Sequence, residues 1–116
     1  MSNLLSQTSA RSFGLMIRHL LLIEFKGDVT SEQIDEVKTL FEAIPKTVEG
    51  VLSVEWGLND SPEGKNKGFT HTVLMNFADE AGRKNYLPHP EHEALRAFFK
   101  PLVADIIVFD YTVPDA

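Results

Sequence analysis

Apolar and polar positions along the chain follow two periods, one typical of strands and one typical of helices. Short apolar or alternating stretches predict strands at residues 17–25, 51–58, 69–77 and 103–113. Apolar residues at three- and four-residue steps predict helices that begin after Thr30, after Asp79 and at Pro90. The helices that begin after Asp79 and at Pro90 belong to one helical region, which Pro88 and Pro90 interrupt after Tyr86. The predicted order is therefore βαββαβ.

Both ends of the first helix carry sequence signals. Thr30 and Gln33 have the spacing of a capping box, in which each side chain pairs with the other residue's backbone. Apolar residues then form one stripe, and Pro45 is expected to end the helix. The stripe consists of Ile34, Val37, Leu40, Phe41 and Ile44.

The predicted strand at residues 51–58 alternates between an apolar and a polar face. The apolar face is expected to carry Leu52, Val54, Trp56 and Leu58. Trp56 is expected in the core or in an interface between two copies, because large aromatic residues dominate such surfaces. The polar run 59–67 has turn composition and predicts a hairpin connection at the surface.

A βαββαβ order is most simply satisfied by a four-stranded antiparallel sheet with helices on one face, which is an α+β, ferredoxin-like fold. Residues 17–25 and 103–113 are apolar on both faces, yet the helices can cover only one of them. The other face would expose a larger apolar patch than soluble monomers usually tolerate. We therefore expect a homodimer closed sheet against sheet, and a higher oligomer stays open as an alternative.

Length and composition restrict the class of protein. The 116 residues suit a single domain, expected at residues 16–116, preceded by a mobile extension at residues 1–15. That extension lacks the pattern of a signal peptide, and no apolar run approaches the roughly 20 residues that cross a bilayer. The formal charge of -6 disfavours nucleic acid as a partner, and the absence of cysteine excludes disulfides and thiolate metal sites. We expect a cytoplasmic protein that does not bind membranes.

The stretch from Tyr86 to His92 is the candidate functional site in the sequence. It holds one tyrosine and two histidines on a backbone that two prolines restrain. Imidazole exchanges protons near neutral pH, so His92 could remove a proton next to a carbonyl group while the Tyr86 hydroxyl polarises the oxygen. The alternative is that His89 and His92 cap or pack at a helix start and that Tyr86 is buried for stability.

The histidines do not form an evident metal site. His71 shares a strand face with apolar neighbours and is expected to be a buried, hydrogen-bonded structural residue. His19 also points inward, but antiparallel pairing separates it from His71 along the sheet. His89 and His92 are three residues apart and lack the spacing of a helical zinc motif. No metal and no cofactor is expected.

Five segments, taken in order, carry a resemblance to a known family. They are residues 17–26, 50–57, 68–71, the Tyr86-x-x-His89-Pro90-x-His92 motif and residues 108–111. In their order and spacing they resemble the stress-responsive dimeric α+β barrel family, also called the Dabb domain. The resemblance implies a ferredoxin-like unit that dimerises through its sheet, in agreement with the pattern described above.

The resemblance also implies roles for individual residues. The chain is similar to a plant polyketide cyclase of this family, which performs an intramolecular aldol condensation with a histidine base and a tyrosine that orients the substrate. On the matching positions the base is His92 and the tyrosine is Tyr86. The implied substrate pocket is lined by His19, Leu21, Ile23, Val37, Phe41, Val73, Met75, Leu95, Ile106 and Val108. Where that cyclase has a tyrosine on its first helix, this chain has Phe41, so one polar contact to the substrate is missing.

Two hypotheses follow from these observations. In the first, a homodimer binds a small apolar carbonyl or carboxyl compound between sheet and helices, with cofactor-independent proton transfer of the cyclase or lyase type. In the second, the protein is a non-catalytic, stress-associated oligomer whose Tyr86–His92 turn serves structure alone. An open cavity of roughly 300 Å³ or more that touches both His92 and Tyr86 would favour the first. A monooxygenase of the wider dimeric barrel group ranks last, because no haem ligand arrangement is evident.

Overall fold

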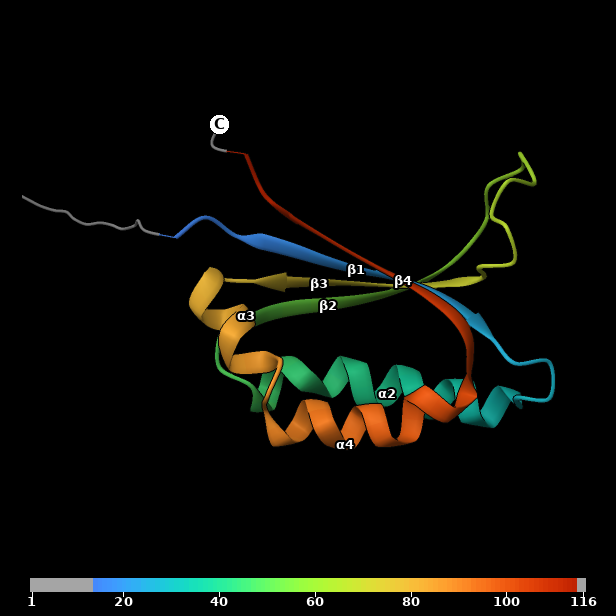
Figure 1. The fold of residues 1–116 in the computed structure, drawn as a ribbon, viewed down its shortest axis with the longest axis horizontal. Coiled ribbons are helices and arrows are strands. Elements are labelled where there is room, and N and C mark those ends of the chain that lie inside the picture. The colour runs from blue at the N-terminus through green and yellow to red at the C-terminus, as the bar shows by residue number, and fades with distance from the viewer. Residues whose placement is uncertain (1–13, 115–116) are drawn as a thin grey trace, which may run out of the picture.

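Four strands form one antiparallel sheet, and the helices lie on one of its faces (Figure 1). The computed structural model describes residues 14–114, so all but the end of the extension expected at residues 1–15 lies outside the described residues. The strands are β1 (Ile17–Phe25), β2 (Val51–Leu58), β3 (His71–Phe77) and β4 (Val103–Thr112). The helices are α2 (Ser31–Thr47), α3 (Glu80–Tyr86) and α4 (Pro90–Phe99), and a short 3-10 helix, η1 (Lys100–Leu102), leads into β4.

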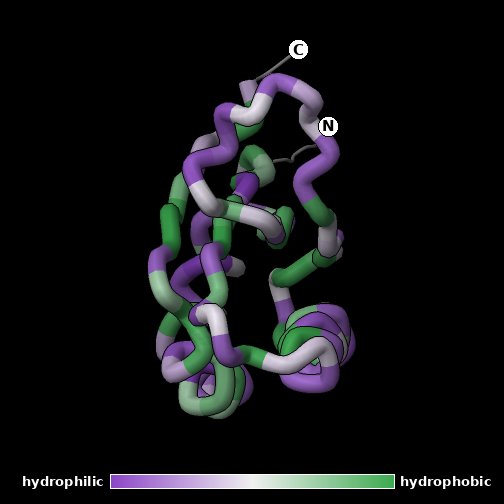
Figure 2. The backbone as a smooth tube through the Cα atoms, turned by 90° about the vertical axis from the view of Figure 1, so that its right-hand side faces the viewer, coloured by the Kyte–Doolittle hydropathy of each residue, from purple (hydrophilic) through white to green (hydrophobic). Residues whose placement is uncertain are grey.

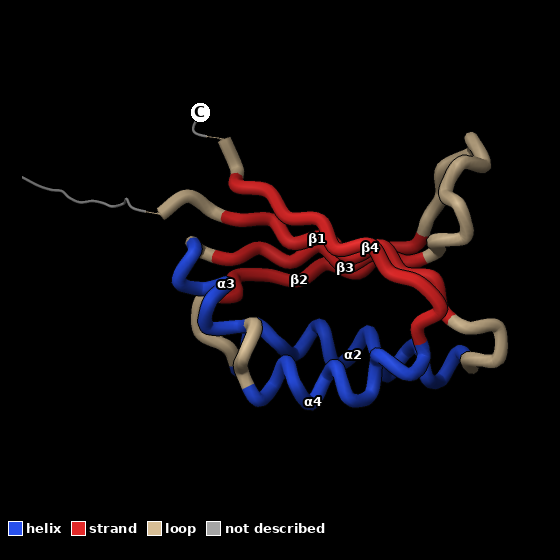
Figure 3. The backbone as a smooth tube through the Cα atoms, viewed as in Figure 1, coloured by secondary structure: helices blue, strands red, loops and turns tan. Residues whose placement is uncertain are grey.

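The sheet has the strand order β2-β3-β1-β4, and every neighbouring pair is antiparallel. Strands and helices form two layers (Figure 3). This arrangement confirms the predicted ferredoxin-like βαββαβ fold with the helices on one face.

Helix α2 begins as predicted and ends later than predicted. The Gln33 amide donates to the Thr30 hydroxyl at 3.1 Å, and the Thr30 amide donates to the Gln33 side chain at 2.9 Å, which completes the capping box. The expected end at Pro45 is wrong, because the helix continues to Thr47. A proline in the last turn removes only one backbone hydrogen bond. The Val48 amide still bonds to the Ile44 carbonyl at 2.9 Å, and burial of Val48 favours the extra turn.

Two further helix starts have side-chain caps. The Asp79 carboxylate accepts a hydrogen bond from the Gly82 amide at 3.0 Å and begins α3. Pro90 occupies the first turn of α4, and His89 caps that helix by accepting from the Glu91 amide at 3.0 Å. Both starts were predicted from the sequence, and the caps fix the bend between α3 and α4.

The strands differ from the prediction in three places. Leu52 was expected on the apolar face of β2, but a bulge next to it turns Val51 to the core and leaves Leu52 54% exposed. The third strand begins at His71 instead of Phe69, since the Phe69 amide closes a turn onto the Asn66 carbonyl. The last strand ends at Thr112.

The two faces of the sheet have different partners. The face toward the helices carries most of the core, and each long helix has a hydrophobic side and a hydrophilic side when viewed along its axis (Figure 2). On the opposite face, here called the outer face, no helix of residues 14–114 is present (Figure 1). Its exposed apolar side chains come from β1 and β4 and include Leu22, Ile107, Phe109 and Tyr111. Among residues 14–114, no helix has both the length and the apolar character needed to cross a membrane.

Candidate active site

A cavity of about 350 Å³ lies between the β1–β4 half of the sheet and the helices. Its polar wall residues are His19, Tyr86, His92, Arg96 and Lys100. Its apolar wall residues are Leu21, Phe41, Leu87, Leu95, Phe99, Val103, Ile106 and Val108. The cavity therefore touches both His92 and Tyr86 and exceeds the volume set above as favouring ligand binding.

The structure divides the predicted pocket residues into two groups. The cavity wall contains His92, Tyr86, His19, Leu21, Phe41, Leu95, Ile106 and Val108. The predicted lining residues Ile23, Val37, Val73 and Met75 do not line the cavity. Each of these four is 0% exposed and packed in the core. Ile23, Val73 and Met75 point inward from the sheet and Val37 packs on them from α2, so all four lie in the close-packed core.

The cavity forms where the helical layer stops covering the sheet. Leu21 on β1 is buried, whereas its register partner Val108 on the edge strand β4 is 58% exposed. Both side chains lie in the cavity wall. On the closed side, Phe41 and Phe99 meet edge to face, with ring centroids 5.3 Å apart. The cavity is therefore closed by aromatic packing on one side and open toward β4.

Tyr86 and His92 form the closest aromatic pair in the wall. Their ring centroids are 4.3 Å apart, with an interplanar angle of 39°. Tyr86 is the last residue of α3, and His92 lies in the first turn of α4, so the capped bend between the two helices fixes their relation. The Tyr86 ring also packs on Phe77 at 5.5 Å, which holds the phenol against the sheet.

The orientation of the His92 ring follows from one hydrogen bond. Its Nδ1 lies 2.8 Å from the Leu87 carbonyl oxygen, and a carbonyl can only accept, so Nδ1 carries the proton. In the neutral ring, Nε2 is then the proton acceptor. Burial lowers the pKa of His92, and the bond to Leu87 opposes that effect. His92 is consequently neutral and basic at Nε2 near pH 7.

Tyr86 has the opposite protonation tendency. It is 1% exposed, and burial raises the pKa of its hydroxyl far above the ordinary value of 10.0. The phenol therefore stays protonated and can donate a hydrogen bond. Within residues 14–114 its hydroxyl makes no hydrogen bond to another residue, and Tyr86 lies in the cavity wall.

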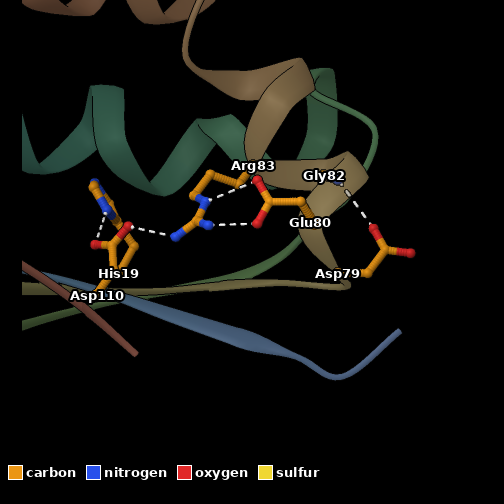
Figure 4. Close-up of polar contacts among 6 residues, drawn as sticks. All are labelled: His19, Asp79, Glu80, Gly82, Arg83 and Asp110. Carbon is orange, nitrogen blue, oxygen red and sulfur yellow. Dashed lines mark hydrogen bonds and ion pairs between the residues drawn. The ribbon is translucent and has the colours of Figure 1, made fainter. Parts of the chain in front are cut away.

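A third polar wall residue, His19, belongs to a row of hydrogen-bonded polar side chains (Figure 4). Its Nδ1 lies 2.7 Å from Oδ1 of Asp110 on the adjacent strand β4. The second oxygen of Asp110 accepts from Arg83 at 3.2 Å, and Arg83 also pairs with Glu80 on α3. The bond to Glu80 is the main cause that raises the pKa of Arg83, which keeps the guanidinium charged.

The other two histidines have structural contacts. His89 caps α4, as described above. His71 lies between the rings of Phe25 and Trp56, with centroids at 5.2 and 5.5 Å, and its Nδ1 is 2.7 Å from the Thr70 hydroxyl. Burial lowers the pKa of His71. No cluster of three or more metal-ligating side chains occurs in the described part of the chain.

Sequence reasoning missed several residues of the site. Asp110 was not singled out, although it falls on the inward face of β4 with Ile106 and Val108, where a lone carboxylate needs a partner. Arg96 and Lys100 follow His92 at helical spacing of four and eight residues, so the same periodicity places them on one side of α4. Arg83 carried no comparable signal, because its contact with Asp110 joins distant parts of the chain.

Comparison with known families gives one match over most of the chain. The model of the Stress responsive A/B Barrel Domain family, Dabb, matches residues 17–113. Those residues include every strand and helix described here.

Two relatives are similar to more than four fifths of this chain at low identity. Olivetolic acid cyclase from Cannabis sativa is 24% identical over 98 residues, which cover 84% of this chain and 97% of the cyclase. The stress-response A/B barrel domain-containing protein HS1 from Arabidopsis thaliana is 27% identical over 95 residues, which cover 82% of this chain and 87% of HS1.

Solved structures share the fold. The crystal structure of an Arabidopsis thaliana protein aligns with a TM-score of 0.81 at 26% sequence identity. The alignment covers 86% of this chain and 97% of the Arabidopsis chain. Hydroxynitrile lyase from Passiflora edulis has a TM-score of 0.82 at 22% identity, and the alignment covers 89% of this chain and 97% of the lyase. A dimeric ferredoxin-like protein of unknown function from Thermobifida fusca has a TM-score of 0.75 at 25% identity, and the alignment covers 87% of this chain and 93% of the Thermobifida chain.

Proposed function

Since this chain belongs to the Dabb family of stress-responsive A/B barrel domains, we propose that it binds a small, apolar-bodied carbonyl or carboxyl compound in the cavity between sheet and helices. The proposal includes cofactor-independent proton transfer of the cyclase or lyase type, with His92 as the base and Tyr86 as the hydrogen-bond donor. One observation carries it: the rings of Tyr86 and His92 lie in the wall of the same cavity with their centroids 4.3 Å apart.

The size and lining of the cavity support a small ligand. Its volume of about 350 Å³ lies at the lower end of the usual range for ligand sites. Eight of the thirteen wall residues are apolar and offer contact area to a ligand, among them Leu21, Phe41, Leu95 and Ile106. An apolar body with one polar end matches this distribution.

The protonation states of the two central residues suit a carbonyl group. A ketone or ester oxygen accepts hydrogen bonds, and the Tyr86 phenol stays protonated because burial raises its pKa. The neutral His92 ring presents an acceptor nitrogen that could take the proton from the adjacent carbon. The electron pair of that carbon–hydrogen bond would move toward the carbonyl oxygen, where the phenol stabilises the developing charge.

Two cations favour a carboxylate at one end of the ligand. Arg96 and Lys100 are exposed residues of the cavity wall, one helical turn apart on α4 and at its end. Within residues 14–114, the ion pair of Arg96 is a long one with Glu93, at 3.7 Å, which leaves other guanidinium donors for a ligand. Cationic side chains at an open rim attract a carboxylate in a protein whose net charge is -6. The olivetolic acid cyclase relative is named after a carboxylic acid.

A thermal-shift experiment tests ligand binding with matched probes. We expect para-butylbenzoic acid to raise the melting temperature of the wild type by several degrees at saturation, since ligand binding stabilises only the folded state. Its amide, para-butylbenzamide, should have a smaller effect. In Arg96→Gln the difference between acid and amide should shrink. If neither this acid nor a wider panel of aromatic and polyketide-like acids changes the melting temperature, the binding proposal is wrong.

The role of His92 needs a variant that keeps its structural bond. His92→Asn retains a side-chain donor for the Leu87 carbonyl but removes Nε2. The matched control is His89→Asn, because asparagine is also a good helix cap and His89 is absent from the cavity wall. We expect proton exchange at the carbon next to the carbonyl of a bound ketone to slow in His92→Asn and to continue in His89→Asn. Equal exchange in both variants would contradict the base assignment.

We also propose that the functional unit is a homodimer closed through the outer face. Phe109 is 61% exposed and Ile107 is 41% exposed there, and three solved neighbours are described as dimeric. Covering these side chains removes the apolar patch from water. Light scattering at micromolar concentration should give the mass of two chains for the wild type and of one chain for Phe109→Glu. A wild-type monomer would contradict the proposal.

A non-catalytic stress-associated protein is the second candidate function. The observation in its favour is that the polar bonds of His89 and His92 hold the helix bend. If His92→Asn and Tyr86→Phe leave both probe binding and proton exchange unchanged, this second function is preferred.

A further inference from the structure

Three polar side chains of the cavity wall follow one line along α4 and its end. His92, Arg96 and Lys100 succeed one another at steps of four residues, so they lie on one side of the helix. Lys100 keeps helical backbone angles, with φ of -55° and ψ of -42°, although it follows the last residue of α4. Each step of four residues advances about 6 Å along a helix. The wall therefore places a guanidinium about one turn, and an ammonium group about two turns, from the proposed base.

The wall alongside these polar groups is apolar. Leu95 and Phe99 are buried residues of α4 and belong to the same wall. Ile106 on β4 adds an apolar side chain from the sheet. A ligand that lies along α4 would thus meet the rings of Tyr86 and His92 at one end, apolar side chains along its body and a cation at the other end.

The guanidinium of Arg96 is available and lies toward the base. The side chain is 47% exposed, and its ion pair with Glu93 is 3.7 Å long, which exceeds the length of a hydrogen bond. Side chains on a helix lean toward its N-terminus, which brings the guanidinium back toward the turn that holds His92. The electrostatics agree with this direction, because burial is the main cause that lowers the pKa of His92 and the positive charge of Arg96 lowers it further.

The charged and titratable groups around His92 come from three elements. Arg96 and Glu93 lie on α4, Tyr86 lies on α3 and His19 lies on β1. Glu93 raises the pKa of His92, whereas Arg96 and His19 lower it. A carboxylate bound to Arg96 would cancel a positive charge that opposes protonation of His92. Such a ligand would therefore make the neighbouring base stronger.

We propose that Arg96 determines the substrate class of the cavity by binding the carboxylate of a keto acid, while the ketone of the same molecule lies about one helical turn away, between Tyr86 and His92. The inference rests on the proposed function and narrows it, because neither a simple ketone nor a simple acid uses both ends of the site. An apolar spacer as long as that turn must hold the two groups of the keto acid apart.

A keto acid in this position also fits the proton transfer proposed for the site. Nε2 of His92 takes a proton from the carbon next to the ketone, and the electron pair of the broken carbon–hydrogen bond moves to the ketone oxygen, which accepts a hydrogen bond from Tyr86. The carboxylate keeps its bonds and its charge at Arg96. The enolate returns to the ketone when His92 gives back a proton, so a proton from solvent can replace the original one.

Three matched probes test the spacing. Para-acetylbenzoic acid carries its ketone and carboxylate on opposite sides of a benzene ring, benzoylformic acid carries the same two groups on adjacent carbon atoms, and para-acetylbenzamide has the shape of the first without its charge. In calorimetric titration we expect the wild type to bind para-acetylbenzoic acid about tenfold more tightly than either of the others, a usual effect of a hydrogen bond to a charged group. Equal affinities for the two acids would overturn the spacing, and equal affinities for para-acetylbenzoic acid and its amide would overturn the carboxylate site.

Variants of the two cationic residues locate the carboxylate. Arg96→Gln should abolish the preference for para-acetylbenzoic acid over its amide, and Arg96→Lys should keep part of it, since the charge remains. Lys100→Gln should reduce the preference less than Arg96→Gln, because Lys100 lies a further turn from His92. A preference that survives in Arg96→Gln, or that falls equally in Lys100→Gln, would overturn the role of Arg96.

A measurement without ligand tests the direction of the Arg96 side chain. Nitrogen NMR over a pH series gives the pKa of His92 in isotope-labelled protein. We expect a higher pKa in Arg96→Gln than in the wild type, because a positive charge near the ring is removed. The control Lys84→Gln removes an exposed positive charge from α3 and should leave the pKa of His92 unchanged. An unchanged pKa of His92 in Arg96→Gln would show that the guanidinium points away from the base and would overturn the inference.

The inference and the proposed function fail in distinguishable ways. If the wild type binds neither para-acetylbenzoic acid, nor the neutral ketone meta-hydroxyacetophenone, nor any acid of the thermal-shift panel, the proposed function is wrong and the inference with it. If the wild type binds the acid and the neutral ketone, and Arg96→Gln binds para-acetylbenzoic acid as tightly as the wild type does, the cavity is a ligand site and Arg96 does not select its substrate.

Discussion

The two halves of the helix-facing sheet surface differ in how completely they are covered. On β3, the side chains of Val73, Met75 and Phe77 are fully buried under the helices. On β4, Val108 is 58% exposed although it lies on the same face, and it borders a cavity of about 350 Å³. In a domain of this size, stability depends on the apolar area that the core buries. The packed half thus stabilises the domain, and the hollow half is available for a ligand.

The largest expected difference between the halves is in stability. Met75→Ala should lower the free energy of unfolding by about 2–5 kcal/mol, since it leaves a hole in the packed half. Val108→Ala should cost less than about 1 kcal/mol, because much of that side chain already contacts solvent. Urea denaturation measures the loss of stability in both variants. The protein concentration is kept the same, because the stability of a dimer depends on it. Similar losses for the two variants would remove the distinction.

The second prediction concerns the helix that carries Tyr86 and Arg83. Gly82 of α3 meets Gly50, which has a positive φ of 97°, and a Cβ on Gly82 would lie 2.6 Å from the Gly50 carbonyl oxygen. Gly82→Ala should therefore shift α3 and lower the free energy of unfolding by about 1–3 kcal/mol. Gly27→Ala is the control, since its Cβ would meet nothing within 4 Å. Equal stability of the two variants would show that the close approach is not required.

Tyr86→Phe should separate function from stability. The variant keeps the buried ring and removes a hydroxyl that has no hydrogen-bond partner within residues 14–114. The free energy of unfolding should change by less than about 1 kcal/mol, because the hydroxyl makes no hydrogen bond to another described residue and Tyr86 lines the cavity. Affinity for meta-hydroxyacetophenone should fall about tenfold with the lost hydrogen bond. A loss of stability on this substitution would instead indicate a structural role for the hydroxyl.

The smallest expected effect is in the pH dependence of stability. Burial lowers the pKa of His92 below the ordinary value of 6.5, so the unfolded chain binds more protons than the folded protein near that pH. His92 therefore makes stability fall as the pH decreases from above 6.5 toward the folded-state pKa. His92→Asn should flatten the dependence between neutral and mildly acidic pH, measured as the urea midpoint. Part of the slope should remain, because burial also lowers the pKa of His71. An unchanged slope would contradict the shift assigned to His92.

Local signals in the sequence predicted most of the fold. The bounds of β1 and β2, the Thr30 capping box and the caps at Asp79 and Pro90 follow from residue types at short spacing. The errors arose where tertiary contacts outweigh such signals. Pro45 lies inside α2 because Val48 is buried beyond it, and the bulge at Leu52 changes which side chains of β2 face the core.

The candidate site was less predictable than the fold. Alternation along the strands correctly indicates that Val73 and Met75 point inward, but it cannot tell a packed face from a hollow one, which depends on where the helices end. The contact between Arg83 and Asp110 also depends on the placement of α3 over β4, which no local pattern encodes.

Methyl NMR of the protein titrated with meta-hydroxyacetophenone tests the central claim most directly, because it reports on both halves of the sheet at once. We predict that the methyl signals of Leu95, Ile106 and Val108 move in proportion to saturation, while those of Val37 and Val73 stay in place. Shifts confined to the outer face, or no shifts at any concentration, would contradict the account of a ligand site in the hollow half of the sheet.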